Sequence, residues 1–170
     1  MSLFLIIGAA VIVPIAVVLG VGKALPVAHV ARVRSTIHKP VHDVWQLLTD
    51  FASYPSWRPG VAKSEQVGEL WKEVSPKGEA MTFETVERVA QKRLVRRIAD
   101  KNLPFGGQWI FELEPRGESE TIVTITEEGE VYNPVFRFVS RFIMGHHATL
   151  KVLLEDLGKH FGQEMEIEKR

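Results

Sequence analysis

The feature that most constrains the fold is a succession of short segments with alternating apolar and polar residues between residues 63 and 132. Five strands are expected there, at residues 63–74, 80–89, 94–99, 108–114 and 121–131, separated by the turn signals "SPKGE", "AQKR", "DKNLPFGG" and "PRGESE". Short strands joined by tight turns pair with their neighbours in antiparallel fashion. Trp109, Phe111 and Leu113 share one face of their strand, opposite polar side chains. The sheet therefore has one apolar face that another element must cover.

Segments with helical patterns lie on both sides of this region in the sequence and can cover the apolar face of the sheet. Residues 30–37 alternate like a half-buried strand, and residues 38–51 place an apolar stripe at helical spacing behind Pro40. A second short, irregular helix is expected before Pro59 and Gly60. Residues 133–163 carry apolar side chains at helical spacing and predict one long amphipathic helix, with a kink at Gly145. The expected fold is α+β, a curved antiparallel sheet wrapped around a long C-terminal helix.

The N-terminal segment has a different character. Residues 3–22 contain no charged side chain and, at about 1.5 Å per residue, can cross the hydrocarbon core of a bilayer. Lys23, Arg32 and Arg34 follow this segment, which predicts a single-pass anchor with the folded domain in the cytoplasm. A cleaved export signal and a buried soluble helix are the alternatives. The expected organisation is an anchor (1–22), a linker (23–29), a folded domain (30–163) and a polar tail (164–170).

Composition and missing motifs narrow the functional classes. The chain has 21 Lys and Arg against 21 Asp and Glu, so no net positive field attracts nucleic acid. It has no cysteine, which excludes disulfides and thiolate ligands. His146 and His147 are adjacent and diverge by about 100° on a helix, so we predict no metal site and no cofactor. Hydrolase, phosphate-loop and dinucleotide fingerprints are missing from the sequence, which favours binding over catalysis.

Four stretches carry a family resemblance: "VWQLLTDFASYPSWRPGV", "PFGGQWIFELEP", "TIVTITEEGEV" and "LLEDLGKHF". Together they resemble the SRPBCC superfamily of START-like, polyketide-cyclase-like and birch-pollen-allergen-like proteins over residues 28–163. The resemblance implies a helix-grip fold with a hydrophobic cavity between the sheet and the last helix. It implies a small hydrophobic molecule or lipid as partner, without fixing an activity, because the superfamily includes lipid carriers, hormone binders and cyclases.

The stretch "DFASYPSWRPGV" (residues 50–61) is expected to border the mouth of that cavity. Phe51 and Trp57 are predicted to fill the space between helices as core, whereas Tyr54 is predicted to meet ligand with its hydroxyl at a wet edge. The candidate ligand-binding residues are Tyr54, Trp57, Phe83, Trp109, Phe111, Val123, Ile125, Phe142 and Leu150.

Weak catalytic candidates lie in "TEEGE", namely Glu127 and Glu128. Glu127 shares strand parity with Val123 and Ile125 and is expected to face the cavity, where burial suits acid–base chemistry. The alternative is that these glutamates are solvated and pair across strands with Arg93, Arg96 and Arg97, which are themselves expected on a solvated strand face. Three functions remain: a membrane-tethered binder or carrier of a hydrophobic ligand, a cyclase or dehydratase on small aromatic substrates, and a regulatory module with a collapsed cavity.

Overall fold

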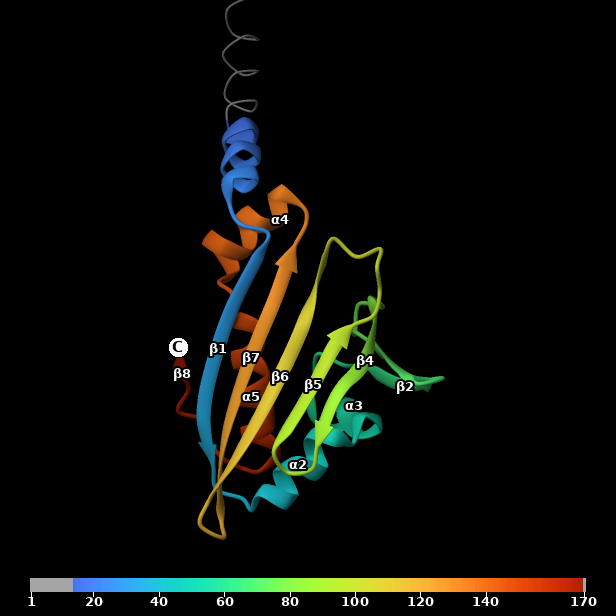
Figure 1. Ribbon diagram of the computed structural model, residues 1–170, viewed down its shortest axis with the longest axis vertical. Helices are drawn as coiled ribbons and strands as arrows, with labels where there is room; N and C mark the ends of the chain where they lie inside the picture. The colour runs from blue at the N-terminus through green and yellow to red at the C-terminus, as the bar shows by residue number, and fades with distance from the viewer. Residues whose placement is uncertain (1–13, 170) are drawn as a thin grey trace, which may run out of the picture.

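The computed structural model describes residues 14–169, in which one antiparallel sheet of eight strands has the order β2-β3-β4-β5-β6-β7-β1-β8 (Figure 1). The elements are β1 (Ala28–Ile37), α2 (Val41–Thr49), η1 (Phe51–Ser53), α3 (Tyr54–Trp57), β2 (Lys63–Val67), β3 (Leu70–Val74), β4 (Ala80–Val89), β5 (Arg93–Ile98), β6 (Phe105–Arg116), β7 (Glu120–Val131), α4 (Pro134–Val139), η2 (Ser140–Met144), α5 (Ala148–His160) and β8 (Glu168–Lys169). The predicted α+β fold with a large antiparallel sheet is confirmed.

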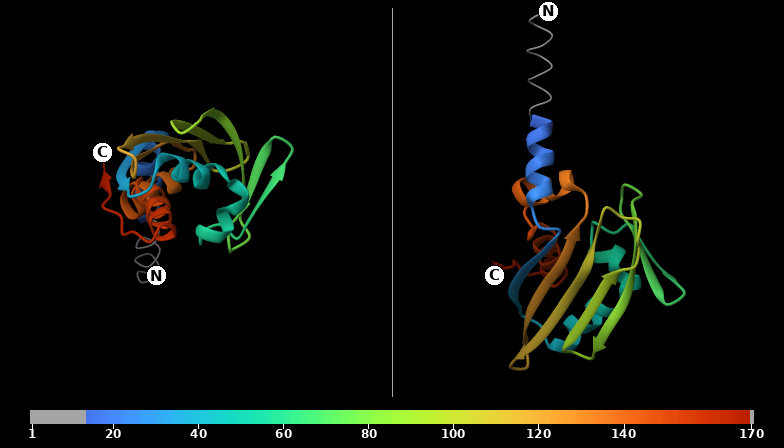
Figure 2. Two further views of the ribbon diagram at one scale, coloured as in Figure 1. Left: turned by 90° about the horizontal axis from the view of Figure 1, so that it is seen from below. Right: turned by 45° about the horizontal axis from the view of Figure 1, so that its top comes forward.

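The sheet curves, and α5 lies on the inner side of this curve (Figure 2). Leu150, Leu154 and Leu157 of α5 are completely buried because they form one helical stripe facing the sheet. Their partners in the core include Val33 of β1 and Ile125 of β7, which are also completely buried. Burial of these two apolar faces against each other is the main stabilising contact of the domain.

The segment predicted as a single strand over residues 63–74 is a hairpin. Val67 of β2 pairs with Leu70 of β3, and the turn between them begins at Gly68, whose φ is +63°. A two-residue hairpin loop of this kind requires positive φ, which glycine adopts without steric cost. A turn of only two residues, Gly68 and Glu69, was overlooked inside the longer run that was read as one strand.

The prediction of a single long C-terminal helix over residues 133–163 is also wrong. The helical segment α4–η2 ends at Gly145, whose φ of +76° lies in the left-handed region, and α5 begins only at Ala148. Asn133 caps the start of α4, because its side-chain oxygen accepts hydrogen bonds from the backbone N–H groups of Val135 and Phe136. What was expected as a kink is therefore a complete break between two helices.

The predicted membrane span at residues 3–22 lies largely outside the described residues. Residues 14–24 are helical, and Ile15 and Val17 are about half exposed on this helix. Within residues 14–169, no helix has both the length and the apolar character needed to cross a membrane. The end of the described helix contacts α4, because the Arg137 Nη1 donates to the Leu25 carbonyl oxygen at 2.8 Å (Figure 1).

The polar tail expected at residues 164–170 folds back onto the domain over its described part. Lys169 of β8 pairs with Val33 of β1, and the Ser35 hydroxyl donates to the Glu166 carbonyl oxygen at 2.7 Å. Met165 and Ile167 pack against the hydrophobic core. Two apolar residues among the charges thus attach the tail to the edge of the sheet.

Candidate functional site: a two-lobed cavity

The space between the sheet and the helices is not completely filled. One cavity of about 460 Å³ lies among α3, β3 to β6 and α5, and is called the Arg96 lobe below. A second cavity of about 400 Å³ lies among β6, β7, α4 and the start of α5, and is called the Glu127 lobe. The two lobes share four lining residues, Met81, Phe105, Trp109 and Thr149. Each lobe has the volume of an ordinary small-molecule site, about 300–1,000 Å³.

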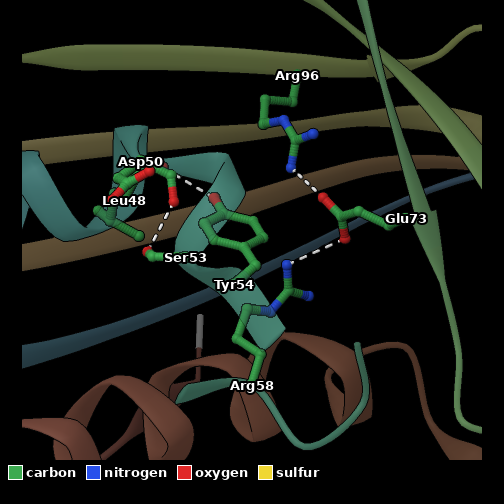
Figure 3. A network of polar contacts seen from close by, with 7 residues as sticks. All are labelled: Leu48, Asp50, Ser53, Tyr54, Arg58, Glu73 and Arg96. Carbon is green, nitrogen blue, oxygen red and sulfur yellow. Dashed lines mark hydrogen bonds and ion pairs between the residues drawn. The ribbon is translucent and has the colours of Figure 1, made fainter. Parts of the chain in front are cut away.

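Arg96 reaches its lobe because of the alternation in β5. Leu94, Arg96 and Ile98 share one face of this strand, and all three are buried, with Arg96 only 4% exposed. A buried arginine requires a partner. The Arg96 Nη1 donates to Glu73 Oε1 at 2.6 Å, and the Arg58 Nη1 donates to Glu73 Oε2 at 3.2 Å (Figure 3). One buried carboxylate therefore bridges two arginines that come from β5 and from the end of α3.

Aromatic rings surround the Arg96 guanidinium. Its central carbon lies 4.1 Å from the ring centre of Phe51 and 4.5 Å from that of Phe83. Such cation–π contacts offset part of the lost hydration of the charge. They do not supply hydrogen-bond acceptors: Nη1 of Arg96 bonds to Glu73, but within residues 14–169 the buried Nε and Nη2 have no hydrogen-bond partner.

Tyr54 does not lie at a wet rim, and in this respect the sequence-based interpretation was wrong. Its side chain is 1% exposed, and its hydroxyl donates to the Leu48 carbonyl oxygen at 2.8 Å (Figure 3). Burial raises the pKa of Tyr54, although Arg96 and Arg58 act in the opposite direction. Phe51 and Trp57 are 4% and 7% exposed, so their predicted role as core is confirmed.

In the Glu127 lobe, a carboxylate is held by three donors. Glu127 Oε1 lies 3.1 Å from His29 Nε2, while Oε2 accepts from Trp109 Nε1 at 3.1 Å and from the Thr149 hydroxyl at 2.9 Å. The prediction from strand parity that Glu127 faces the cavity is confirmed. The ring of His29 also stacks on that of His146, with their centres 4.0 Å apart. Burial lowers the pKa of His146, and His29 and Arg141 lower it further.

Glu128 points away from this lobe. It accepts a hydrogen bond from the Gln108 Nε2 at 2.8 Å, as expected for its opposite strand parity. The predicted pairing of the 127–128 glutamates with arginines is wrong, because the arginines have other partners: Arg93 pairs with Glu87 and Glu112, Arg96 with Glu73, and Arg97 with Glu84. The described residues contain no cluster of three or more His, Asp or Glu that could hold a metal ion.

The predicted ligand-binding residues are distributed over three environments. Tyr54, Phe83, Trp109 and Phe111 line the Arg96 lobe, and Trp109 also lines the Glu127 lobe. The side chains of Val123, Ile125 and Leu150 are completely buried in the core, where Trp57 also lies. Phe142 is 59% exposed and lies on η2.

The sequence interpretation missed the polar residues that distinguish the two lobes. Arg58, Glu73 and Arg96 in one lobe, and His29 and His146 in the other, were not chosen as ligand-binding residues. Arg96 could have been found, since it alternates with Leu94 and Ile98 in "LVRRI". His29 and Glu127 are 98 residues apart, and no local pattern connects them.

A curved sheet, a covering C-terminal helix and a cavity between them define the SRPBCC class with its START-like proteins. Residues 28–157 match the family described as "Polyketide cyclase / dehydrase and lipid transport", and the chain belongs to this family. The sequence matches none of the curated proteins with which it was compared.

Solved structures agree on the fold. A conserved protein from Geobacillus kaustophilus has a TM-score of 0.68 at 15% identity, with 82% of this chain and 99% of that chain covered. A START superfamily protein from Mycobacterium smegmatis has a TM-score of 0.59 at 14% identity, covering 76% and 96%. A truncated norcoclaurine synthase from Thalictrum flavum has a TM-score of 0.63 at 14% identity, covering 79% and 94%. Such identities establish the architecture alone.

Proposed function

We propose that the protein binds a small hydrophobic molecule or lipid in the two-lobed cavity and holds or carries it at a membrane. The observation that supports this most strongly is the cavity itself: apolar side chains such as Phe83, Trp109 and Phe111 line it, and polar groups are concentrated at Arg96 and Glu127. A mostly apolar pocket with a few placed polar groups is the usual form of a small-molecule site. The open cavity also disfavours a module with a collapsed core.

The proposed membrane tether is residues 3–22, with the folded domain in the cytoplasm. Supporting it, the described helix at residues 14–24 leaves apolar side chains exposed, and it contacts α4. Next along the chain from α4, Phe142, Ile143 and Met144 of η2 are 59%, 71% and 61% exposed. Met144 also lines the Glu127 lobe. A bilayer covering these side chains would lie beside that lobe, so a ligand could pass between them without crossing water.

Ligand extraction from the full-length protein tests the proposal. Protein purified in a mild detergent should release a co-purifying apolar molecule, detected by native mass spectrometry and after solvent extraction. Met81→Trp, which adds bulk where the two lobes meet, should remove this molecule and reduce binding of the neutral dye Nile red. Val86→Trp places the same side chain on the same strand at an exposed position and is the matched control. Equal ligand content in the Met81→Trp and Val86→Trp proteins would contradict a role for the cavity.

A cyclase or dehydratase is the second candidate, because Glu127 and two histidines face the same lobe. A carboxylate beside an imidazole can remove and return a proton on a bound substrate. If small aromatic substrates are converted, Glu127→Gln should reduce turnover by about 10²-fold or more, with dye binding unchanged. If the protein only binds, the same change should leave apolar-ligand affinity within about 1 kcal/mol, since contact area dominates such binding.

A further inference from the structure

One edge of the Arg96 guanidinium has no partner. Nη1 bonds to Glu73, whereas Nε and Nη2, which lie on the same edge of the planar group, have no hydrogen-bond partner within residues 14–169. The side chain is only 5% exposed. Buried polar groups in folded proteins are almost always hydrogen-bonded, and an unpaired charged donor is especially costly. The two N–H groups of this edge are parallel and together form a fork for two acceptor atoms.

Neighbouring side chains do not supply those acceptors. Both oxygens of Glu73 are engaged, one by Arg96 and the other by Arg58. The Tyr54 hydroxyl donates its proton to the Leu48 carbonyl, and although it interacts with Arg96, it forms no complete hydrogen bond with Nε or Nη2. Asp156, the other buried acid of the described chain, interacts electrostatically with Arg58 and Lys159. The fork is therefore open to acceptors from a molecule in the adjoining cavity.

The adjoining cavity specifies the rest of that molecule. Arg96 lines the lobe of about 460 Å³ together with apolar side chains, among them Phe83 and Leu153. Phe51 and Phe83 hold the guanidinium by their rings, so its plane is fixed before any ligand arrives. A carboxylate has two oxygens whose spacing matches two parallel N–H groups, and such bidentate pairs are the strongest that arginine forms.

We propose that the Arg96 lobe binds the carboxylate of an amphipathic ligand, with its two oxygens on Nε and Nη2 of Arg96 and its apolar part along the cavity. This proposal rests on the proposed function, that the cavity holds a hydrophobic molecule. It adds the chemical class of that molecule: an apolar carboxylic acid in its ionised form, in preference to an alcohol or a neutral lipid.

The test compares decanoate with decanol, which differ only in the head group. The full-length protein, reconstituted in phosphatidylcholine nanodiscs, is titrated with each probe and with Nile red, and empty nanodiscs correct for partitioning. Arg96→Met should weaken decanoate binding about tenfold or more while changing decanol and Nile red binding less than about threefold. Arg97→Met is the matched control, because Arg97 is the next residue but lies on the solvent face paired with Glu84. It should change none of the three.

Two further measurements separate the fork from a general effect of charge or folding. Arg96→Lys keeps the charge but not the parallel donors, and should give an intermediate loss of decanoate affinity. In the wild type, the ¹³C signal of bound carboxyl-labelled decanoate should stay at its ionised position through the pH range in which nanodisc-dissolved decanoate takes up its proton. If Arg96→Met alone does not fold, the double variant Arg96→Met/Glu73→Gln removes the buried pair together.

The outcomes distinguish the two proposals. Equal affinity for decanoate and decanol, with no specific effect of Arg96→Met, would overturn the carboxylate site and leave the hydrophobic cavity standing. Tighter binding of decyl phosphate than of decanoate would overturn the carboxylate assignment in favour of a phosphate head group. If neither decanoate, decanol nor Nile red bound, both proposals would be overturned.

Discussion

Two aromatic segments at opposite ends of α5 share a similar sequence character and have opposite environments. In η1–α3, Phe51, Tyr54 and Trp57 are at most 7% exposed, and the Trp57 ring contacts His160 at the end of α5. In α4–η2, Phe136 and Phe142 are 48% and 59% exposed. The first segment has a buried arginine and a helix to pack against, whereas the second is separated from α5 by Gly145. Aromatic spacing identifies a helix, but only the neighbouring elements decide whether its rings are buried.

The largest effect should come from the buried segment. Trp57→Ala is expected to lower the free energy of unfolding by about 3–5 kcal/mol, because it leaves a large cavity in a well-packed region. Urea unfolding of the full-length protein, followed by circular dichroism, measures this loss. Phe142→Ala is the comparison for the exposed segment. A similar loss of unfolding free energy in both variants would contradict the distinction between the two segments.

A smaller effect is expected from a single atom of the buried segment. Tyr54→Phe removes the hydroxyl that donates to the Leu48 carbonyl oxygen and should lower the free energy of unfolding by about 1 kcal/mol or slightly more. Unfolding midpoints in urea report the change. An unchanged midpoint would show that the Leu48 carbonyl finds another donor and that the ring alone stabilises this helix.

The exposed segment should respond to pH through His146. Its pKa is lower in the folded protein than the ordinary 6.5, so below that value the unfolded segment takes up a proton first. The free energy of opening should therefore fall as the pH is lowered through the window just below 6.5, and rise again as the pH is raised. Amide exchange of residues 134–147 at a series of pH values, corrected for intrinsic exchange rates, measures local opening. His146→Asn should flatten this dependence; an identical pH profile would contradict it.

The smallest change in stability is predicted for Phe142→Trp. Because Phe142 is largely exposed, its replacement should leave the free energy of unfolding within about 0.5 kcal/mol. The new indole then reports its surroundings: in full-length protein reconstituted with brominated phosphatidylcholine, the emission of Trp at 142 should be quenched. Val86→Trp, exposed on β4, should not add a quenched component. Equal quenching of the two added residues would argue against contact between η2 and the bilayer.

Alternation along the chain was enough to predict the sheet. Trp109, Phe111 and Leu113 define the apolar face of β6, and the same parity correctly directed Glu127 into a cavity. Parity would also have placed Arg96 inside, but its neighbours in "KRLVRR" suggested a solvated face. The basic composition of this stretch gave the wrong prediction, whereas the two-residue period gave the right one. A strand presents every second residue to the same environment whatever its charge.

Other features depend on contacts that no local pattern contains. The apolar periodicity of residues 133–163 continues across Gly145, yet the helix ends there. The next residue, His146, stacks on His29 of β1. The position of Tyr54 was misjudged because its preferred acceptor proved to be a backbone carbonyl six residues away. Helix ends and buried hydrogen bonds of this kind are settled by tertiary packing, which can override local propensity.

The two edges of the sheet are both protected against pairing with the strands of another molecule. At one border, β2 presents Lys63 and Glu65 to solvent, and charged side chains discourage pairing with another chain. At the other, β8 pairs with β1, and the Gln163 side chain accepts from the His38 backbone N–H and donates to the Thr36 carbonyl. A chain cut before Gln163 would expose the backbone N–H and C=O groups of β1, which could then pair with another molecule. The last few residues therefore protect this edge from self-association.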